Sequence, residues 1–230
     1  MNILISLLAF LLFVFSPAQK DPYKEKREAL VKNHIQKRGV KNDVVLKAMR
    51  TVQRHLFVPE TQISRAYEDR PLPIGYGQTI SQPFIVAYMT DVVKPAAHFK
   101  ALEIGTGSGY QAAVLGEIVK EVYTIEIVPE LGNSATKRLK QLGYNNVKTK
   151  VADGYFGWKE NGPYDIIMVT AAAEFVPPPL IEQLKEGGKM VIPIGSPFMN
   201  QTLMLIEKKK GKPVTKSLLP VIFVPFTRSK

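Results

Sequence analysis

Short apolar runs alternate with longer amphipathic segments over the second half of the chain, and this alternation predicts strands separated by helices. Strands are predicted over residues 101–104, 121–127, 147–151, 164–170 and 189–193. Helical patterns lie between them over residues 110–119, 129–142 and 177–185, and Gly187-Gly188 is predicted to be a turn before the last strand. Two alternating runs, 202–208 and 217–224, flank a turn at 211–213 and predict an antiparallel hairpin. The pattern therefore predicts an α/β fold: a doubly wound, mostly parallel seven-stranded sheet that ends in an antiparallel hairpin.

The part of the chain before this alternation is first helical and then irregular. Residues 24–38 carry an apolar stripe, and a second helical pattern begins behind a cap at Asn42 or Asp43. Residues 67–83 are rich in proline and glycine and predict a long loop. Ser81 lies near the end of this loop, directly before another helical pattern. Its residue type and position alone indicate a helix N-cap.

Residues 1–18 differ from the rest because an apolar run is followed by Ser16-Pro17-Ala18, which resembles a signal cleavage site. The run is shorter than the ~20 residues of a membrane span. Against export, no Lys or Arg precedes the run and the basic flank lies downstream. We expect a signal peptide or short hydrophobic anchor over 1–18, an exported, periplasmic protein, and no stable membrane insertion after processing. The alternative is a cytoplasmic protein.

Residues 19–230 are long enough to form a single domain with its own core. Within it, residues 19–95 are predicted to hold the N-terminal helices and a substrate loop, and residues 96–230 the sheet and the hairpin. The chain has no cysteine, which excludes disulfides and thiolate chemistry, and its three histidines are far apart. We therefore expect no metal.

The formal net charge is +11, and basic residues gather over 20–54 and 208–212. Such clusters favour nucleic acid or acidic partners in some proteins. Apart from Tyr23, no aromatic residues interleave with these lysines, as a groove for single-stranded nucleic acid would require. We therefore interpret the clusters as solvated surfaces and expect no nucleic-acid partner.

Three alternating glycines, Gly105, Gly107 and Gly109, follow the first predicted strand and open a helix. Glycine lets a ligand approach bare backbone, and the helix presents its positive end to that ligand. The spacing is G-x-G-x-G, whereas dinucleotide folds use G-x-G-x-x-G. With Glu103 just before it, the loop resembles that of S-adenosylmethionine (SAM) methyltransferases. On this motif alone, NAD binding or a tight turn without a ligand stays open.

Acidic residues also lie at the ends of the next two predicted strands. Glu126 ends the second strand, where an acid can accept hydrogen bonds from both hydroxyls of a ribose. Asp153 follows the third strand and could accept from an adenine amino group, although an aspartate before Gly154 is also typical of a turn. Because parallel strands end at one edge of a sheet, these acids and Glu103 together predict a SAM site there.

The chain carries a further set of motifs between residues 22 and 227. They lie at residues 38–40, 54–59, 71–83, 101–110, 169–173, 187–195 and 223–227. With these motifs the domain resembles the protein-L-isoaspartate (D-aspartate) O-methyltransferases, and the loop Thr79-Ile80-Ser81 is the most specific part of the resemblance. Some relatives carry a histidine after this loop, where this chain has Val86.

The resemblance implies a repair enzyme that methylates the free α-carboxylate of L-isoaspartyl residues, and more weakly D-aspartyl residues, in damaged proteins. Its cofactor would be SAM, and S-adenosylhomocysteine the product. The resemblance assigns cofactor contacts to Thr79, Ile80, Glu103, Gly105, Gly107, Gly109, Glu126, Asp153 and Gly154. It assigns substrate contacts to Thr79, Ser81, Val224, Pro225 and Thr227, with Ser81 as the catalytic residue.

The expected chemistry is consistent with these residues. A carboxylate is already ionised and nucleophilic at neutral pH, so no strong general base is needed. The rate would come from alignment and from the exclusion of water, with the Ser81 hydroxyl orienting the carboxylate. The alternatives are a SAM-dependent methyltransferase of RNA or of a small molecule, and a SAM-binding protein without catalysis. We expect a monomer whose partners are isoaspartyl-containing proteins and peptides.

Overall fold

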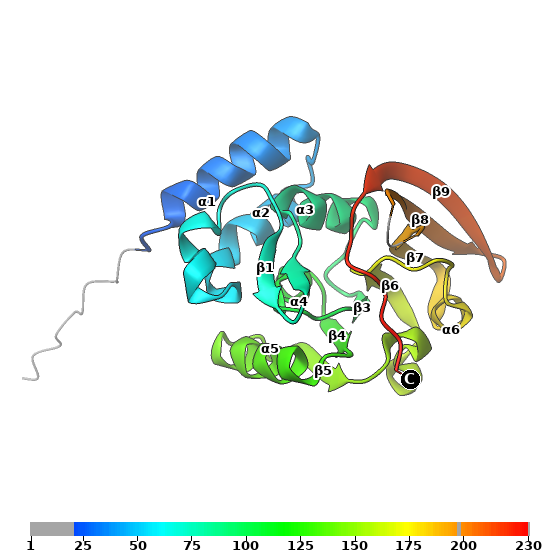
Figure 1. The fold of residues 1–230 in the computed structure, drawn as a ribbon. Helices are drawn as coiled ribbons and strands as arrows, with labels where there is room; N and C mark the ends of the chain where they lie inside the picture. The colour runs from blue at the N-terminus through cyan, green and yellow to red at the C-terminus, as the bar shows by residue number, and fades with distance from the viewer. Residues whose placement is uncertain (1–20, 197–198, 230) are drawn as a thin grey trace, which may run out of the picture.

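The computed structural model describes residues 21–196 and 199–229, so the predicted signal segment lies outside the described residues. A seven-stranded sheet runs through the centre of the described part, in the order β5-β4-β3-β6-β7-β8-β9 (Figure 1). Its strands are β3 (Lys100–Ile104), β4 (Glu121–Glu126), β5 (Val147–Val151), β6 (Tyr164–Val169), β7 (Leu184–Ile194), β8 (Gln201–Lys209) and β9 (Lys212–Val221). The strands β5, β4, β3, β6 and β7 pair in parallel, and β8 pairs antiparallel with both of its neighbours, β7 and β9. The predicted fold class is confirmed.

Helices cover the sheet on both faces, in keeping with a doubly wound fold (Figure 1). They are α1 (Lys24–Leu30), α2 (Asp43–Thr51), α3 (Pro83–Val92), α4 (Tyr110–Gly116), α5 (Pro129–Gln141) and α6 (Pro178–Glu182). The segment predicted as one helix over 24–38 continues α1 with a π-helical turn and a 3-10 turn before it ends at Gly39. Asn42 caps α2, because its side chain accepts a hydrogen bond from the Val44 N–H at 3.1 Å.

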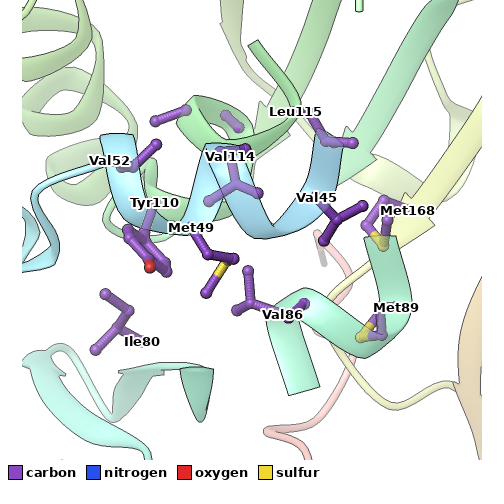
Figure 2. Close-up of a cluster of buried hydrophobic side chains, with 14 of the residues drawn as sticks. Val45, Met49, Val52, Ile80, Val86, Met89, Tyr110, Val114, Leu115 and Met168 are labelled. Atoms are coloured by element: carbon purple, nitrogen blue, oxygen red, sulfur yellow. The ribbon is translucent and has the colours of Figure 1, made fainter. Parts of the chain in front are cut away.

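The side chains of the central strands alternate between two apolar clusters, one on each face of the sheet. On β3, Ala101 belongs to the cluster under the N-terminal helices and Leu102 to the cluster on the α6 side. Figure 2 shows the first cluster, where side chains of α2, α3 and α4 meet Met168 of β6. The N-terminal helices therefore pack directly on the central sheet.

Three predictions about loops were wrong. Residues 67–83 contain a small hairpin, β1 (Leu72–Gly75) and β2 (Gln78–Ile80), which closes through residues with positive φ. The turn predicted at Gly187-Gly188 lies inside β7, because pairing with β6 continues across it through a register shift. The turn of the C-terminal hairpin is at Lys210 and Gly211, so β9 begins at Lys212, earlier than predicted. These segments are too short, or too dependent on pairing, for their pattern to identify them.

The prediction that Ser81 caps α3 was also wrong. The N-cap is Gln82, and Asp69 satisfies the helix terminus instead, because its Oδ1 accepts from the Phe84 N–H at 2.9 Å. The Ser81 hydroxyl therefore has no structural task in starting this helix. Among the helices of the described ranges, none combines the length and the apolar character needed to cross a bilayer.

Candidate active site

The parallel strands end at one edge of the sheet, and a cavity opens there. We call it the strand-end cavity. Its lining includes Thr79, Gly105, Gly107, Glu126, Gly154 and Thr170, together with Val224, Pro225 and Thr227 from the C-terminal tail (residues 224–229). Two further spaces adjoin it: a small inner cavity of about 30 Å³ beneath the glycine loop (residues 105–109), and a groove on the far side of Ser81. The structure thus brings most of the predicted site residues together.

The glycine loop is held open by backbone conformations that favour glycine. Gly105 has a φ of 96°, and its N–H donates to the Ile125 carbonyl at 2.8 Å. The Thr170 hydroxyl donates to the Gly105 carbonyl at 2.8 Å, and a Cβ at position 105 would collide with that hydroxyl. The loop therefore tolerates no side chain here, and its backbone stays exposed to the strand-end cavity.

Glu126 fixes the loop and faces the strand-end cavity at the same time. Its Oε2 accepts from the Gly107 N–H at 2.7 Å, and its Oε1 accepts from the Val128 N–H at 3.0 Å. The side chain is 6% exposed and lines the cavity. Each carboxylate oxygen accepts one of these bonds and retains a further lone pair. The arrangement suits a neighbouring diol that must donate two hydrogen bonds.

Glu103 lies deeper and lines the inner cavity rather than the strand-end cavity. The residue is completely buried; its Oε2 accepts from the Thr124 hydroxyl, and its Oε1 has no hydrogen-bond partner. Burial raises the pKa of Glu103 to about 8, the nearby Glu126 charge adds to the rise, and the Thr124 hydrogen bond opposes it. An unpartnered buried carboxyl oxygen of this kind is costly, and it marks a place where a cation or donor would be stabilised.

Asp153 follows β5 as predicted, but the C-terminal tail occupies its carboxylate. Its Oδ2 accepts from the Arg228 Nε at 2.8 Å and from the Ser229 N–H and hydroxyl, while its Oδ1 accepts from the Tyr155 N–H at 3.0 Å. Burial acts to raise the pKa of Asp153, but these hydrogen bonds outweigh it and lower that pKa. Asp153 does not line the strand-end cavity, whereas its neighbour Gly154 does. Its contact with adenine stays a prediction.

The loop Thr79-Ile80-Ser81 lies where the three spaces meet. Thr79 lines all three, and Ser81 lines the inner cavity and the groove. Ile80 is 3% exposed and lines the inner cavity. The Ser81 hydroxyl makes no hydrogen bond within the described residues and is available to a ligand. The loop is therefore placed to touch a molecule in either space.

Gly109 is the predicted cofactor residue farthest from the cavities. It is the N-cap of α4, with a φ of 86°, and a Cβ there would lie 3.2 Å from the side chain of Leu139 on α5. Gly109 lines neither the strand-end cavity nor the inner cavity. Its local role is to let α4 and α5 pack closely.

Three residues of the site have no clear signal in the sequence. Thr170 lines all three spaces, Asp69 holds the residues that follow Ser81, and Arg228 binds Asp153. Thr170 stands at the end of a predicted strand, which is the only local signal among them. Arg228 reaches the site from the C-terminal end of the chain, whereas Asp69 lies in the same predicted loop as Ser81, 12 residues before it. Within the described residues, no group of His, Asp or Glu side chains is arranged to hold a metal ion.

Comparisons with known proteins agree with this geometry. The family model described as protein-L-isoaspartate(D-aspartate) O-methyltransferase (PCMT) matches residues 25–230. A protein-L-isoaspartate O-methyltransferase of Opitutus terrae is 53% identical over 228 residues, covering 98% of each chain. A protein-L-isoaspartate O-methyltransferase 2 of Syntrophobacter fumaroxidans is 58% identical over 184 residues, covering 80% of this chain and 74% of its own.

Two solved structures resemble the fold over most of its length. One is described as a protein-L-isoaspartate O-methyltransferase, with a TM-score of 0.80 and 32% identity; the match covers 88% of this chain and 65% of that one. The other comes from Plasmodium falciparum, is described as an enzyme of the same kind, and is in complex with S-adenosyl-L-homocysteine. Its TM-score is 0.74 at 29% identity, and the match covers 88% of this chain and 99% of the other.

Proposed function

Because the chain belongs to the protein-L-isoaspartate(D-aspartate) O-methyltransferase family, we propose that its strand-end cavity holds S-adenosylmethionine and that Ser81 orients the substrate. As a member of this SAM-dependent family, the protein is a repair methyltransferase that transfers a methyl group to the free α-carboxylate of L-isoaspartyl residues in damaged proteins. Activity on D-aspartyl residues is the weaker, proposed extension.

The cavity residues support the cofactor assignment. Glu126 has unused acceptor capacity beside the glycine loop, which fits the two hydroxyls of a ribose. Glu103 carries an unpartnered buried oxygen in the inner cavity, which fits the ammonium group of a methionine moiety. Gly105 and Gly154 both line the cavity, and a Cβ at either position would collide with a neighbouring side chain, Thr170 or Ile104. When bound, SAM supplies an electrophilic methyl group on a sulfonium centre.

The observation that carries the proposed catalytic role is the unpartnered hydroxyl of Ser81 at the junction of the spaces. That hydroxyl donates to the substrate carboxylate and directs one oxygen toward the cofactor. The carboxylate is ionised at neutral pH, so Ser81 positions it and takes up no proton. Thr79, beside it, contacts both cofactor and substrate. The rate enhancement comes from this alignment and from the exclusion of water.

The C-terminal tail is proposed to hold the substrate peptide. Val224 lines both the strand-end cavity and the groove, and Pro225 and Thr227 line the cavity. The tail is fixed along the sheet edge, because Ala172 N–H donates to the Val224 carbonyl and Phe226 N–H donates to the Ala172 carbonyl, each at 2.8 Å. A fixed tail loses little conformational entropy when a peptide binds beside it.

A methyl-transfer assay tests the function. Purified protein is given SAM with a labelled methyl group and one of three acceptors: an isoaspartyl peptide, the matching aspartyl peptide, or RNA. We expect base-labile label on the isoaspartyl peptide alone. Label on RNA alone would support a nucleic-acid methyltransferase, and binding of SAM without transfer would support a non-catalytic role.

The substitution Ser81→Ala tests the proposed catalytic residue. Hydrogen bonds to charged groups contribute about 1.5–3 kcal/mol, so kcat should fall roughly 10- to 100-fold. The affinity for S-adenosylhomocysteine by calorimetry and the unfolding free energy should both stay near wild type. Ser217→Ala, on the exposed edge strand β9, is the matched control and should leave kcat unchanged. An unchanged kcat in Ser81→Ala would contradict the assignment.

We also propose that residues 1–18 direct export to the periplasm and are then removed. Their short apolar run and the small-residue site before Gln19 support this. N-terminal sequencing of the protein from fractionated cells tests it: a chain that starts at Gln19 outside the inner membrane supports export. An intact Met1 in the cytoplasm contradicts it.

The enzyme is proposed to act as a monomer and without a nucleic-acid partner. The scarcity of aromatic residues in its lysine clusters supports the second point: Tyr23 is the one Phe, Trp or Tyr in residues 20–54, and residues 208–212 contain none. Light scattering on the purified chain tests the first, and a shift to twice the chain mass would contradict it.

A further inference from the structure

The groove beside Ser81 is large enough for more of the substrate than the isoaspartyl residue. It encloses about 470 Å³ between the Ser81 loop and α3 on one side and residues 219–224 on the other. Ile85, Leu219 and Phe223 contribute apolar lining, and Ile222 is 80% exposed. Such a groove suits residues that neighbour the damaged site in an extended chain.

Arg38 is the one charged residue among the described residues that line this groove. The groove lining has no acidic side chain, and Asp69, the acidic partner of Arg38, does not line the groove. The Arg38 side chain is 48% exposed, which leaves it accessible to a ligand. The groove lining therefore offers a single cationic group to a ligand.

Two contacts hold the Arg38 guanidinium in a fixed position. Its Nη1 donates to the Asp69 Oδ2 at 3.1 Å, and its central carbon lies 3.5 Å from the centroid of the Phe84 ring. Asp69 is itself fixed, because it also accepts from the Gln82 Nε2 and from the Phe84 N–H, both at 2.9 Å. Stacking and the ion pair together reduce the entropy that Arg38 would lose on binding a ligand.

The ion pair with Asp69 leaves most of the guanidinium unused. Arginine has five N–H donors, and one of them is engaged by a described residue. The Asp69 charge is shared among Arg38, Gln82 and the helix terminus at Phe84. The unused N–H donors on the free edge of the guanidinium can bind a carboxylate through two parallel hydrogen bonds.

We propose that Arg38 is a specificity residue that binds a second carboxylate on the substrate, close in sequence to the isoaspartyl residue. The inference rests on the proposed function, because it needs the isoaspartyl residue at Ser81. Asp69 links Arg38 to Gln82, which directly follows Ser81, so the two groups act on one stretch of peptide. The enzyme therefore prefers damaged sites that are flanked by an acidic residue or by a free C-terminus.

The test compares isoaspartyl peptides that differ only in one flanking residue. One set is amidated at the C-terminus and carries Glu or Gln within three residues of the isoaspartyl residue, on either side. A second set carries only Gln and has a free C-terminal carboxylate. For the wild type we expect kcat/KM to be about 10-fold higher for at least one Glu peptide than for its Gln partner. A gain confined to the free C-terminus would identify that carboxylate as the ligand.

Variants then assign the preference to Arg38. In Arg38→Gln the ratio of the Glu to the Gln peptide should fall to about 1, and Arg38→Lys should keep part of it, because charge remains while the planar fork is lost. Arg65→Gln is the matched control, since Arg65 is also exposed and ion-paired, with Glu68. It should keep the wild-type ratio.

The outcomes separate this inference from the proposed function. Equal rates on charged and neutral peptides by the wild type, or an unchanged ratio in Arg38→Gln, overturn the role of Arg38 alone. The wild-type comparison needs no variant, so it decides the matter even if Arg38→Gln fails to fold. If none of the isoaspartyl peptides is methylated, the proposed function itself fails.

Discussion

Glu103 links the stability of the protein to pH, and the substitution Glu103→Gln isolates that link. The carboxyl is completely buried with one unpartnered oxygen, and burial raises its pKa from 4.5 to about 8. In the unfolded chain the same group ionises near 4.5. Because the folded pKa lies above the unfolded one, the contribution of Glu103 to stability is complete below about pH 4.5. It is lost progressively as the pH rises toward 8.

The size of this loss follows from the pKa values. Each unit of pKa shift corresponds to about 1.4 kcal/mol, so Glu103 costs the free protein about 3 kcal/mol at pH 7 and about 4 to 5 kcal/mol above pH 8. These are large fractions of the 5–15 kcal/mol that is typical of a whole domain. A neutral glutamine does not ionise, so the variant escapes this pH-dependent cost. Its extra amide donor adds an unfavourable term that does not vary with pH.

Urea unfolding of both proteins at several values between about pH 5 and pH 8 measures the effect. The unfolding free energy of Glu103→Gln minus that of the wild type should rise by about 1.4 kcal/mol per pH unit. Other titrating groups are common to both proteins and cancel in this difference. A difference that stays constant with pH would refute the argument, because Glu103 would then ionise alike in both states.

The same variant should bind the cofactor product more weakly. A glutamine offers no charge to the proposed ammonium group, so calorimetry should detect a lower affinity for S-adenosylhomocysteine in Glu103→Gln. In the wild type, a cation beside Glu103 lowers its pKa, and binding near pH 7 should release protons that change the measured heat from buffer to buffer. A gain in stability together with a loss of affinity distinguishes a binding residue from a packing residue.

Two glycine-loop predictions complete the set. Glu126→Gln keeps one acceptor oxygen but turns an N–H donor toward one of the two backbone N–H groups that Glu126 satisfies. Calorimetry should therefore detect an affinity for S-adenosylhomocysteine that is reduced by about 10- to 100-fold. An affinity equal to that of the wild type would count against the assignment. Gly105→Ala combines a φ of 96° with a collision at Thr170, and urea unfolding should show that the unfolding free energy falls by about 2–4 kcal/mol. The control Gly211→Ala has a positive φ but open space around it, and its unfolding free energy should fall by about 1 kcal/mol. Equal losses in the two variants would contradict the collision.

The inner strands were the most predictable part of the fold. β3, β4 and β6 are covered on both faces, so their sequences are short, mostly apolar runs with few alternatives. The alternation with helices then required parallel pairing and a doubly wound order. Segments whose structure depends on a partner were less predictable. Gly187 and Gly188 read as a turn, yet β7 continues through them because β6 supplies hydrogen-bonding partners on both sides.

The same distinction applies to the candidate site: its local features could be predicted from the sequence, and its contacts with distant residues could not. The sequence correctly indicated that acids lie near the ends of consecutive strands, because that placement is local to each strand–loop unit. It could not indicate what each carboxylate faces, since those partners come from elsewhere in the chain. Glu126 accepts from the Gly107 N–H in the glycine loop, and Glu103 lines the separate inner cavity. Asp153 is bound by Arg228 of the C-terminal tail.

Side-chain contacts between segments that are separated in sequence fix the positions of the local motifs relative to one another. Arg228 lies 3.7 Å from the centroid of the Tyr155 ring and binds Asp153, so the tail is tied to the loop after β5. Asp69, which precedes β1, likewise holds Gln82 and the Phe84 N–H at the start of α3. Neither link has a local pattern in the sequence. A motif search would therefore find both halves of the site and miss the side chains that align them, although alignment is the main source of rate in this chemistry.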